Sequence, residues 1–148
     1  MEKIVVVIPA YEPDEKLIDV LQQIRQQTDY PIIVVDDGSG EAYAHIFCRL
    51  EQSAIVLHHS MNRGKGSAIK TALAYIWDQQ PEADAVVTID ADGQHKVSDM
   101  LRICEQVKEQ PEALVLGSRS FDGKIPLRSR FGNTITKYVF RFAAGQFV

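Results

Sequence analysis

The segment AVVTIDADGQH, residues 85–95, decides the fold that we expect for this chain. It begins with a run of apolar and β-branched residues, Ala85 to Ile89, which is typical of a strand buried on both faces of a sheet. The run ends at Asp90, and a second aspartate, Asp92, follows two positions later. Two carboxylates this close repel each other, and burying them without a partner is costly. We therefore expect a positively charged group to lie between them.

Four other runs of the same kind occur in the chain, at residues 3–8, 32–35, 54–57 and 113–116. Between the runs, apolar residues recur at helical spacing. These stripes are Leu17, Val20, Leu21 and Ile24, then Ile69, Ala72, Leu73, Ile76 and Trp77, and finally Leu101, Cys104 and Val107 after a helix start signal at Ser98 and Asp99. Residues 41–50 are a further helix candidate. Alternating strands and helices predict an α/β fold with a mostly parallel sheet.

Composition and charge narrow the class of protein. The chain has 148 residues, of which 45% are hydrophobic and 24% charged, so we expect one soluble globular domain spanning residues 1–148. A net charge of -4 provides no basic footprint for nucleic acid. Cys48 and Cys104 lie far apart in helix-like segments and predict neither a disulfide framework nor a zinc site. Because we find neither a signal peptide nor a membrane-spanning run in this sequence, we expect a cytoplasmic setting.

The end of the chain carries an uneven charge. Between Lys124 and Val148 there are five basic residues and no acidic one. Such a segment is either a solvated helix face or a surface for anionic groups, including the phosphates of lipids. Peripheral contact with the inner face of a membrane is therefore one of the expectations for this protein.

Polar motifs follow all five apolar runs. They are PAYEPDE at 9–15, DDGSG at 36–40, HHSMNRGKGS at 58–67, DADGQH at 90–95 and GSRSFDG at 117–123. Because the carboxyl ends of parallel strands meet at one edge of a sheet, where ligands bind in open α/β folds, these motifs predict a binding site there.

The first candidate at this edge is the aspartate pair. If the segment is extended, Asp90 and Asp92 point to the same side and offer hard oxygen ligands to Mg²⁺ or Mn²⁺. Gln94 could supply another oxygen. The alternative interpretation is a surface Asp-Gly turn without a metal.

Two further motifs indicate a nucleotide. Asp36 or Asp37 could accept a hydrogen bond from ribose hydroxyls or a base edge, or could cap the following helix. In NRGKGSA, Lys65 and Gly66 open a helix, and its glycines let backbone amides approach a phosphate. The spacing is not that of a Walker A loop, and no G-x-G-x-x-G follows the first run.

Each of the remaining candidate binding residues also has a structural or surface interpretation. Tyr11 could stack on a base or simply pack at the rim. Arginine side chains are suited to binding phosphate, but most are solvated. The arginines that could lie opposite the aspartates of this edge are Arg119, Arg128 and Arg130. We interpret His45, His58 and His59 as structural or surface residues, because nothing near them has ligand spacing.

The motifs IPAYE, VVDDGS, NRGKGSA, DADGQH and GSR, in this order, resemble the family-two nucleotide-sugar glycosyltransferases with a GT-A fold. The similarity runs from Lys3 to about Asn133 and is strongest to the polyprenyl-phosphate branch, which includes dolichyl-phosphate mannose synthases. The resemblance implies a nucleoside pocket lined by Pro9, Tyr11 and Asp37, with Val35 and Asp36 nearby. Glu12 is carried over as a binding residue, although the family often has Asn-Glu where this chain has Glu-Pro.

The resemblance also implies that Asp90, Asp92 and Gln94 hold Mg²⁺ or Mn²⁺, with Ala91 among the donor-binding residues. Asp92 and Arg119 would be catalytic, and Arg119, Arg128 and Arg130 would meet phosphates of the donor or of the acceptor. The implied reaction moves a sugar, with inversion, from a UDP or GDP sugar to a polyprenyl phosphate or another glycan acceptor.

Two alternatives accompany this hypothesis. The acceptor-side segment of the family is expected to be largely absent from this chain, so the domain could bind the donor without transferring the sugar. A phosphatase of the haloacid-dehalogenase type also uses a D-x-D-G motif, but there it ends the first strand and Thr or Ser follows the glycine. Here the motif ends the fourth run and Gln94 follows Gly93, which disfavours a phosphatase.

Overall fold

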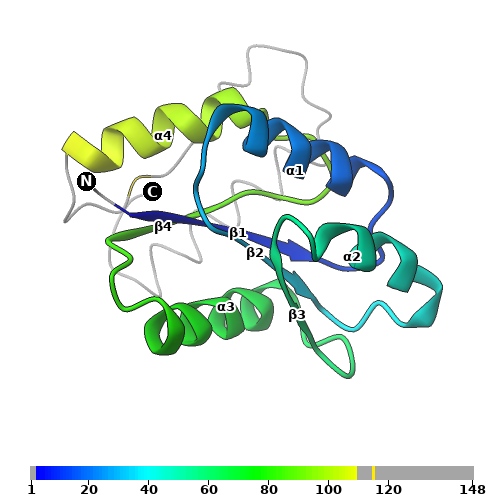
Figure 1. Ribbon diagram of the computed structural model, residues 1–148. Helices are drawn as coiled ribbons and strands as arrows, with labels where there is room; N and C mark the ends of the chain where they lie inside the picture. The colour runs from blue at the N-terminus through cyan, green and yellow to red at the C-terminus, as the bar shows by residue number, and fades with distance from the viewer. Residues whose placement is uncertain (1–2, 110–114, 116–148) are drawn as a thin grey trace, which may run out of the picture. The chain divides into compact units, whose positions relative to one another are not determined.

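A parallel sheet of four strands in the order β3-β2-β1-β4 lies at the centre of the computed structural model (Figure 1). The structure describes residues 3–109 and residue 115. The strands are β1 (Ile4–Ala10), β2 (Ile32–Asp36), β3 (Ile55–His58) and β4 (Ala85–Thr88). The first four predicted runs are therefore strands, and the expected α/β fold with a parallel sheet is confirmed. Most of the fifth run lies outside the described residues.

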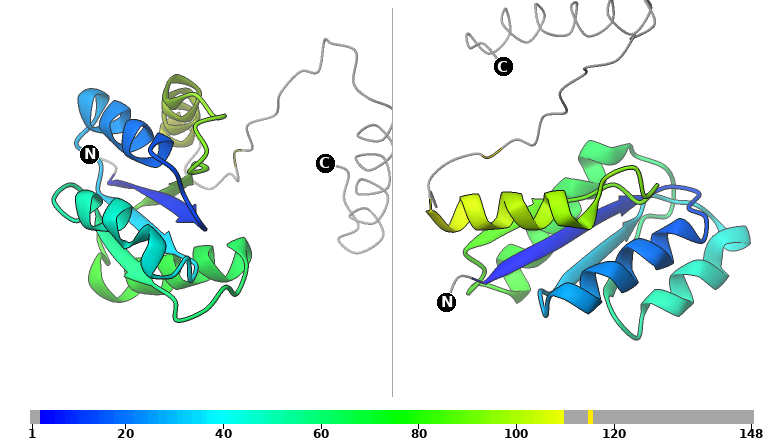
Figure 2. Two further views of the ribbon diagram at one scale, coloured as in Figure 1. Left: turned by 90° about the vertical axis from the view of Figure 1, so that its right-hand side faces the viewer. Right: turned by 90° about the horizontal axis from the view of Figure 1, so that it is seen from above.

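Helices connect the strands and cover both faces of the sheet. They are α1 (Lys16–Gln27), the short 3-10 helix η1 (Glu41–Tyr43), α2 (Ala44–Leu50), α3 (Lys65–Gln79) and α4 (Val97–Glu109). Figure 2 shows α1 and α4 on one face of the sheet and α3 on the other. The basic segment from Lys124 to Val148 lies outside the described residues.

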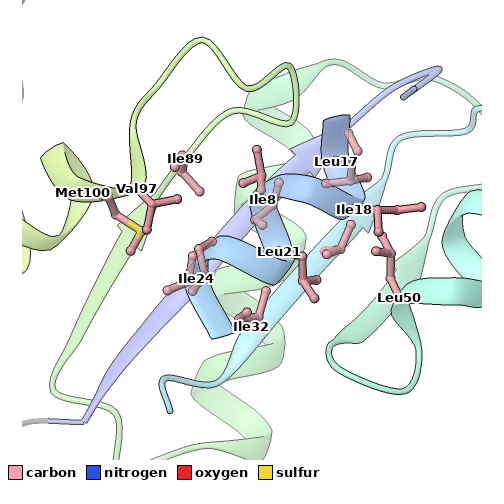
Figure 3. Packing of buried hydrophobic residues seen from close by; sticks show 14 of the residues in the cluster. Ile8, Leu17, Ile18, Leu21, Ile24, Ile32, Leu50, Ile89, Val97 and Met100 are labelled. Carbon is pink, nitrogen blue, oxygen red and sulfur yellow. The ribbon is translucent and has the colours of Figure 1, made fainter. Parts of the chain in front are cut away.

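Alternating residues of β1 build two separate cores. Ile4, Val6 and Ile8 point toward α1, α2 and α4, and the larger core on this face contains Leu17, Leu21, Ile24 and Met100 (Figure 3). Val5 and Val7 point to the other face and pack with α3. Because β1 is buried on both faces, its sequence is a continuous apolar run rather than an alternating one.

The predicted stripe of α3 is partly wrong. The residues that α3 buries are Ala68, Ala72 and Ile76, whereas Leu73 is 45% exposed and Trp77 is 84% exposed. Leu73 and Trp77 each follow a buried residue by one position, and one position rotates a side chain by about 100° around a helix axis. Ala68, Ala72 and Ile76 face the strands, whereas Leu73 and Trp77 do not.

Strand pairing places the carboxyl ends of the strands close together. Ala10 at the end of β1 pairs with Asp36 at the end of β2, and Asp36 pairs with His58 at the end of β3. On the other side, Val7 pairs with Thr88 at the end of β4. The motifs that follow these four strands therefore meet at one edge, as expected. Among the described residues, no helix is long and apolar enough to cross a membrane.

Candidate functional site

A cavity of about 390 Å³, hereafter the edge cavity, lies at the carboxyl edge of the sheet. Its volume is in the range of small-ligand sites. It is lined by Pro9, Ala10, Tyr11, Asp37, Asn62, Gly64, Lys65, Asp90, Ala91 and Asp92. These residues come from the end of β1 and from the segments that follow the four strands. The edge cavity thus brings together Pro9, Tyr11, Asp37, Lys65, Asp90, Ala91 and Asp92 from the predicted site residues.

A second cavity, of about 450 Å³, lies between α1 and the start of α4. It is slightly larger, but its wall consists mainly of α1 side chains such as Gln23 and Gln27 and of residues 95–98. It lacks the aspartate pair and the tyrosine that converge on the edge cavity. We therefore place the candidate site in the edge cavity.

We expected a positive group between Asp90 and Asp92, and a lysine contacts one of the two, Asp90. Lys65, the first residue of α3, donates a hydrogen bond from its ammonium group to Oδ1 of Asp90. The imidazole Nδ1 of His95 lies 3.5 Å from Oδ2 of the same carboxylate. Both oxygens of Asp90 therefore face a basic side chain, which offsets the repulsion that Asp92 would exert on an unpaired Asp90.

Asp92 lies in a turn rather than in an extended segment. β4 ends at Thr88, and Ala91 and Asp92 lie in a turn, so residues 90–92 do not form one extended segment as expected. Oδ1 of Asp92 accepts a hydrogen bond of 2.9 Å from the backbone N–H of Gln94, which closes an Asp-Gly turn. The turn nevertheless leaves both aspartates in the wall of the edge cavity. The turn is therefore observed, and it does not exclude a ligand role for the two aspartates.

The predicted cation site offers two carboxylates, those of Asp90 and Asp92. Within residues 3–109 and 115, no group of three or more His, Cys, Asp or Glu side chains is placed to hold a metal ion. Gln94, the third predicted ligand, does not line the edge cavity. Mg²⁺ is often bound by only one or two carboxylates together with substrate phosphates, so the residues present fit that ion. The metal site stays a prediction.

Asp37 is the most buried acid of the site. Its side chain is 4% exposed, and Oδ1 accepts hydrogen bonds from the backbone N–H of Arg63 and from Nδ1 of His59. Oδ2 accepts one from the backbone N–H of Gly64. Burial is the largest influence and raises the pKa of Asp37, but the bonds from Arg63, His59 and Gly64 together outweigh it and lower that pKa below the ordinary value.

His59, which we interpreted from the sequence as structural or surface, is a buried residue that contacts Asp37. Its side chain is 6% exposed, and Nδ1 lies 2.7 Å from Asp37 while Nε2 lies 2.8 Å from Oγ1 of Thr71. The sequence signal for this contact is the tandem His58-His59 after the third run, which matches the tandem Asp36-Asp37 after the second run. In a parallel pair of strands with this register, each histidine meets one aspartate.

Asp36 has a structural role. Its Oδ1 accepts a hydrogen bond from the backbone N–H of Ser39, and its Oδ2 lies 2.9 Å from Nδ1 of His58. The 3-10 helix η1 starts after Gly40 without a side-chain cap, so neither Asp36 nor Asp37 caps it. Asp36 and Val35 do not line the edge cavity, and Val35 belongs to the core under α3.

Glu12 and Gly66 also lie outside the cavity wall. Glu12 has a φ of 48°, which is unusual for a residue with a side chain, and its backbone N–H donates to Oγ of Ser39. A hydrogen bond to Glu12 and its negative charge raise the pKa of Tyr11, which is 49% exposed at the cavity rim. Glu12 thus lies beside Tyr11, a residue of the cavity wall. Arg119, Arg128 and Arg130 lie outside the described residues.

Comparison with known proteins decides the family. The family model described as "Glycosyl transferase family 2" matches residues 5–147. The chain belongs to this glycosyltransferase family. The family match decides against the phosphatase alternative.

Several curated relatives of this chain carry named activities. The chain is 28% identical to a UDP-N-acetylglucosamine–dolichyl-phosphate N-acetylglucosaminyltransferase of Methanococcus voltae, over 98% of this chain and 64% of the relative. It is 30% identical to an undecaprenyl-phosphate mannosyltransferase of Micrococcus luteus, over 82% of this chain and 50% of the relative. The predicted similarity to the polyprenyl-phosphate branch is confirmed. The chain spans between half and two thirds of the length of these relatives.

A solved structure of the same fold contains a nucleotide. The crystal structure of residues 1–349 of TarS from S. aureus, in complex with UDP, superposes with a TM-score of 0.53 at 21% identity, covering 73% of this chain and 33% of that one. At this identity the likeness concerns the fold alone, and the predicted GT-A fold is confirmed.

Proposed function

We propose that this glycosyltransferase moves a sugar from a nucleotide-diphosphate sugar to a polyprenyl phosphate. The observation that carries the proposal is the edge cavity, in which the aromatic Tyr11, the cationic Lys65 and the carboxylates of Asp90 and Asp92 converge. These are the groups that a base, a diphosphate and a divalent cation need. The names of the relatives support a polyprenyl-phosphate acceptor.

In this proposal the donor lies along the edge cavity. Tyr11 offers an aromatic face to the base, and Pro9 completes the wall beside it. Lys65 sits at the N-terminus of α3, where the helix dipole favours anions, so the diphosphate would meet both a side-chain cation and a positive helix end. UDP is the first nucleotide to test, because the Methanococcus relative is named for a UDP sugar and the TarS structure contains UDP. GDP is the second.

A divalent cation belongs to the proposal. Asp90 and Asp92 would hold Mg²⁺ or Mn²⁺, with Gln94 as a further oxygen donor, and the diphosphate would complete its coordination. When bound, the cation would neutralise negative charge on the leaving nucleoside diphosphate. Lys65, which lies on Asp90, would then be available to the diphosphate oxygens.

The transfer itself needs little from the protein beyond orientation. An oxygen of the acceptor phosphate attacks the anomeric carbon of the sugar and forms a new C–O bond. The bond from that carbon to the diphosphate breaks on the opposite face, and its electron pair leaves with the nucleoside diphosphate, so the configuration inverts. Because the acceptor phosphate is already an anion, no general base is required. Arg119, Arg128 and Arg130 would bind phosphates, and the basic segment would lie against an anionic membrane surface.

Transfer of labelled sugar from UDP-N-acetylglucosamine and GDP-mannose to undecaprenyl phosphate in detergent tests this proposal, with the Methanococcus relative as positive control. We expect sugar on the lipid with one of the two donors, and none when Asp92 is replaced by Asn. If the chain binds donor but transfers no sugar while the relative does, the chain is a donor-binding domain.

A further inference from the structure

His59 and Asp37 form a buried contact at the edge cavity, which Asp37 lines. Their side chains are 6% and 4% exposed, and Nδ1 of His59 lies 2.7 Å from Oδ1 of Asp37. Asp37 is also joined to β1, because its backbone N–H donates to the carbonyl of Ala10. His59 is joined to β2 in the same way, through its N–H and the carbonyl of Asp36. The pair is therefore fixed by the sheet on both sides.

This pair holds the turn that leads into α3. The backbone N–H groups of Arg63 and Gly64 donate to the two oxygens of Asp37, at 3.0 and 2.7 Å. Gly64 has a φ of 89° and immediately precedes Lys65, the first residue of α3. The position of the Lys65 ammonium group therefore depends on how Asp37 is held.

A second contact, between Gly38 and the backbone of Met61, also holds the turn that leads into α3. Gly38 has a φ of 77°, and a Cβ atom at that position would lie 2.3 Å from the carbonyl carbon of Met61. The turn that follows β3 thus packs directly on the backbone of the turn that follows β2. In this arrangement both oxygens of Asp37 are occupied by groups of the chain itself.

The imidazole of His59 connects Asp37 to α3. Because Asp37 is an acceptor as a carboxylate, Nδ1 of His59 carries the proton and donates it. Nε2 then accepts from the hydroxyl of Thr71 in a neutral ring, or donates to it in a charged ring. In either state the ring makes both contacts, so it links the end of β2 to the second turn of α3.

We infer that His59 is a positioning residue for the nucleotide donor, acting through Asp37 on the turn at residues 62–65. This inference rests on the proposed function, and it gives Asp37 the role of holding Arg63 and Gly64 at the wall of the edge cavity. Without His59, Asp37 loses one hydrogen-bond donor. The backbone that carries Asn62, Gly64 and Lys65 into the cavity wall is then held less firmly. We expect the nucleotide donor to bind more weakly, while the rate of sugar transfer from the bound nucleotide changes little.

The chain offers a matched control. His58 makes the equivalent contact with Asp36, but its side chain is 49% exposed and Asp36 does not line the edge cavity. His58→Ala therefore removes a similar histidine–aspartate contact one residue away. The conservative variant is His59→Asn, whose amide nitrogen can take the place of Nδ1.

The test measures UDP binding by calorimetry and KM and kcat for the variants that transfer sugar. His59→Ala should weaken UDP binding by about tenfold, the scale of one hydrogen bond to a charged group. It should raise KM with little change in kcat, whereas His59→Asn should stay within about threefold of the wild type and His58→Ala should match it. Equal weakening by His58→Ala and His59→Ala, or no weakening by a folded His59→Ala, would overturn the inference.

Amide hydrogen exchange separates this inference from the proposed function. The amides of Arg63 and Gly64 should exchange at least about tenfold faster in His59→Ala than in the wild type, with or without nucleotide. If the wild type binds neither UDP nor GDP, the proposed function fails, and unchanged exchange at both amides would overturn the positioning role separately. If His59→Ala does not fold, Thr71→Val replaces it, with a smaller increase in exchange expected and no increase counting against the inference.

Discussion

The ammonium group of Lys65 contacts the carboxylate of Asp90 and so joins the first residue of α3 to the loop that follows β4. A lysine therefore occupies an oxygen that the proposed cation would use. In the proposed site, a cation that bound this oxygen would displace Lys65, and the released ammonium group would lie beside the diphosphate. Lysine, cation and diphosphate would then be coupled through one carboxylate.

Replacing Lys65 with methionine should have opposite effects on metal and nucleotide. Without nucleotide, Mn²⁺ should bind about two- to fivefold more tightly, because an exposed ion pair no longer competes for Asp90. UDP should bind more weakly in the same variant, because its diphosphate loses a cation. Electron paramagnetic resonance of free Mn²⁺ and calorimetry of UDP measure the two effects. Weaker Mn²⁺ binding in Lys65→Met would contradict the competition.

Asp92→Asn separates the turn from the metal site. Asparagine can still accept the hydrogen bond from Gln94, so the free energy of unfolding should change by less than about 0.5 kcal/mol. Its neutral amide is a poorer ligand for a hard cation, so the Mn²⁺-dependent part of UDP binding should fall by about tenfold or more. Urea denaturation and calorimetry give the two values. UDP binding that keeps its full dependence on Mn²⁺ in this variant would place the metal elsewhere.

The low pKa of Asp37 predicts an acid-dependent loss of stability. A carboxyl whose pKa is lower in the folded than in the unfolded protein stabilises the fold above its unfolded pKa, and this contribution is lost as the pH falls through the folded pKa. Asp37→Asn should cost about 1 to 2 kcal/mol near neutral pH. The difference from the wild type should shrink as the pH falls from about 5 to below about 3.9, the ordinary pKa of an aspartate. Urea denaturation across this range measures it, and a constant difference would show that Asp37 titrates normally.

Gly38 and Gly40 form a natural pair for testing the packing of the turn after β2. Both have positive φ, 77° and 84°, but only Gly38 lies against the Met61 backbone, whereas a Cβ at Gly40 would meet nothing within 4 Å. Gly40→Ala should cost about 1 kcal/mol from backbone strain alone. Gly38→Ala should cost at least about 1 kcal/mol more and should also weaken UDP binding, because it displaces residues 61–62. Equal losses of stability in urea denaturation would indicate that the turns do not pack this closely.

Local patterns predicted the strands and the ligand-binding edge well. The runs at 3–8, 32–35, 54–57 and 85–89 are continuous and β-branched, and each coincides with a strand to within two residues. The motifs after them were expected at one edge because parallel strands end together. The α3 stripe was partly misplaced, since Leu73 and Trp77 satisfy a helical spacing but the alanines pack on the sheet.

Contacts between distant segments were harder to predict. Asp37 and His59 are 22 residues apart and meet because β2 and β3 pair in one particular register, which no local pattern contains. Lys65 and Asp90 are 25 residues apart and meet because α3 starts beside the loop after β4. The sequence supported a positive charge near Asp90 on electrostatic grounds, but the residue that supplies it depends on the tertiary structure.

Calorimetric titration of UDP and GDP, first with Mn²⁺ and then with EDTA, tests the central claim most directly. The account predicts that one of the two nucleotides binds in the presence of Mn²⁺ and that EDTA abolishes or strongly weakens this binding. It also predicts that the binding is lost in Asp92→Ala, which removes a carboxylate from the edge cavity. Failure of the well-folded protein to bind either nucleotide with Mn²⁺ would contradict the account.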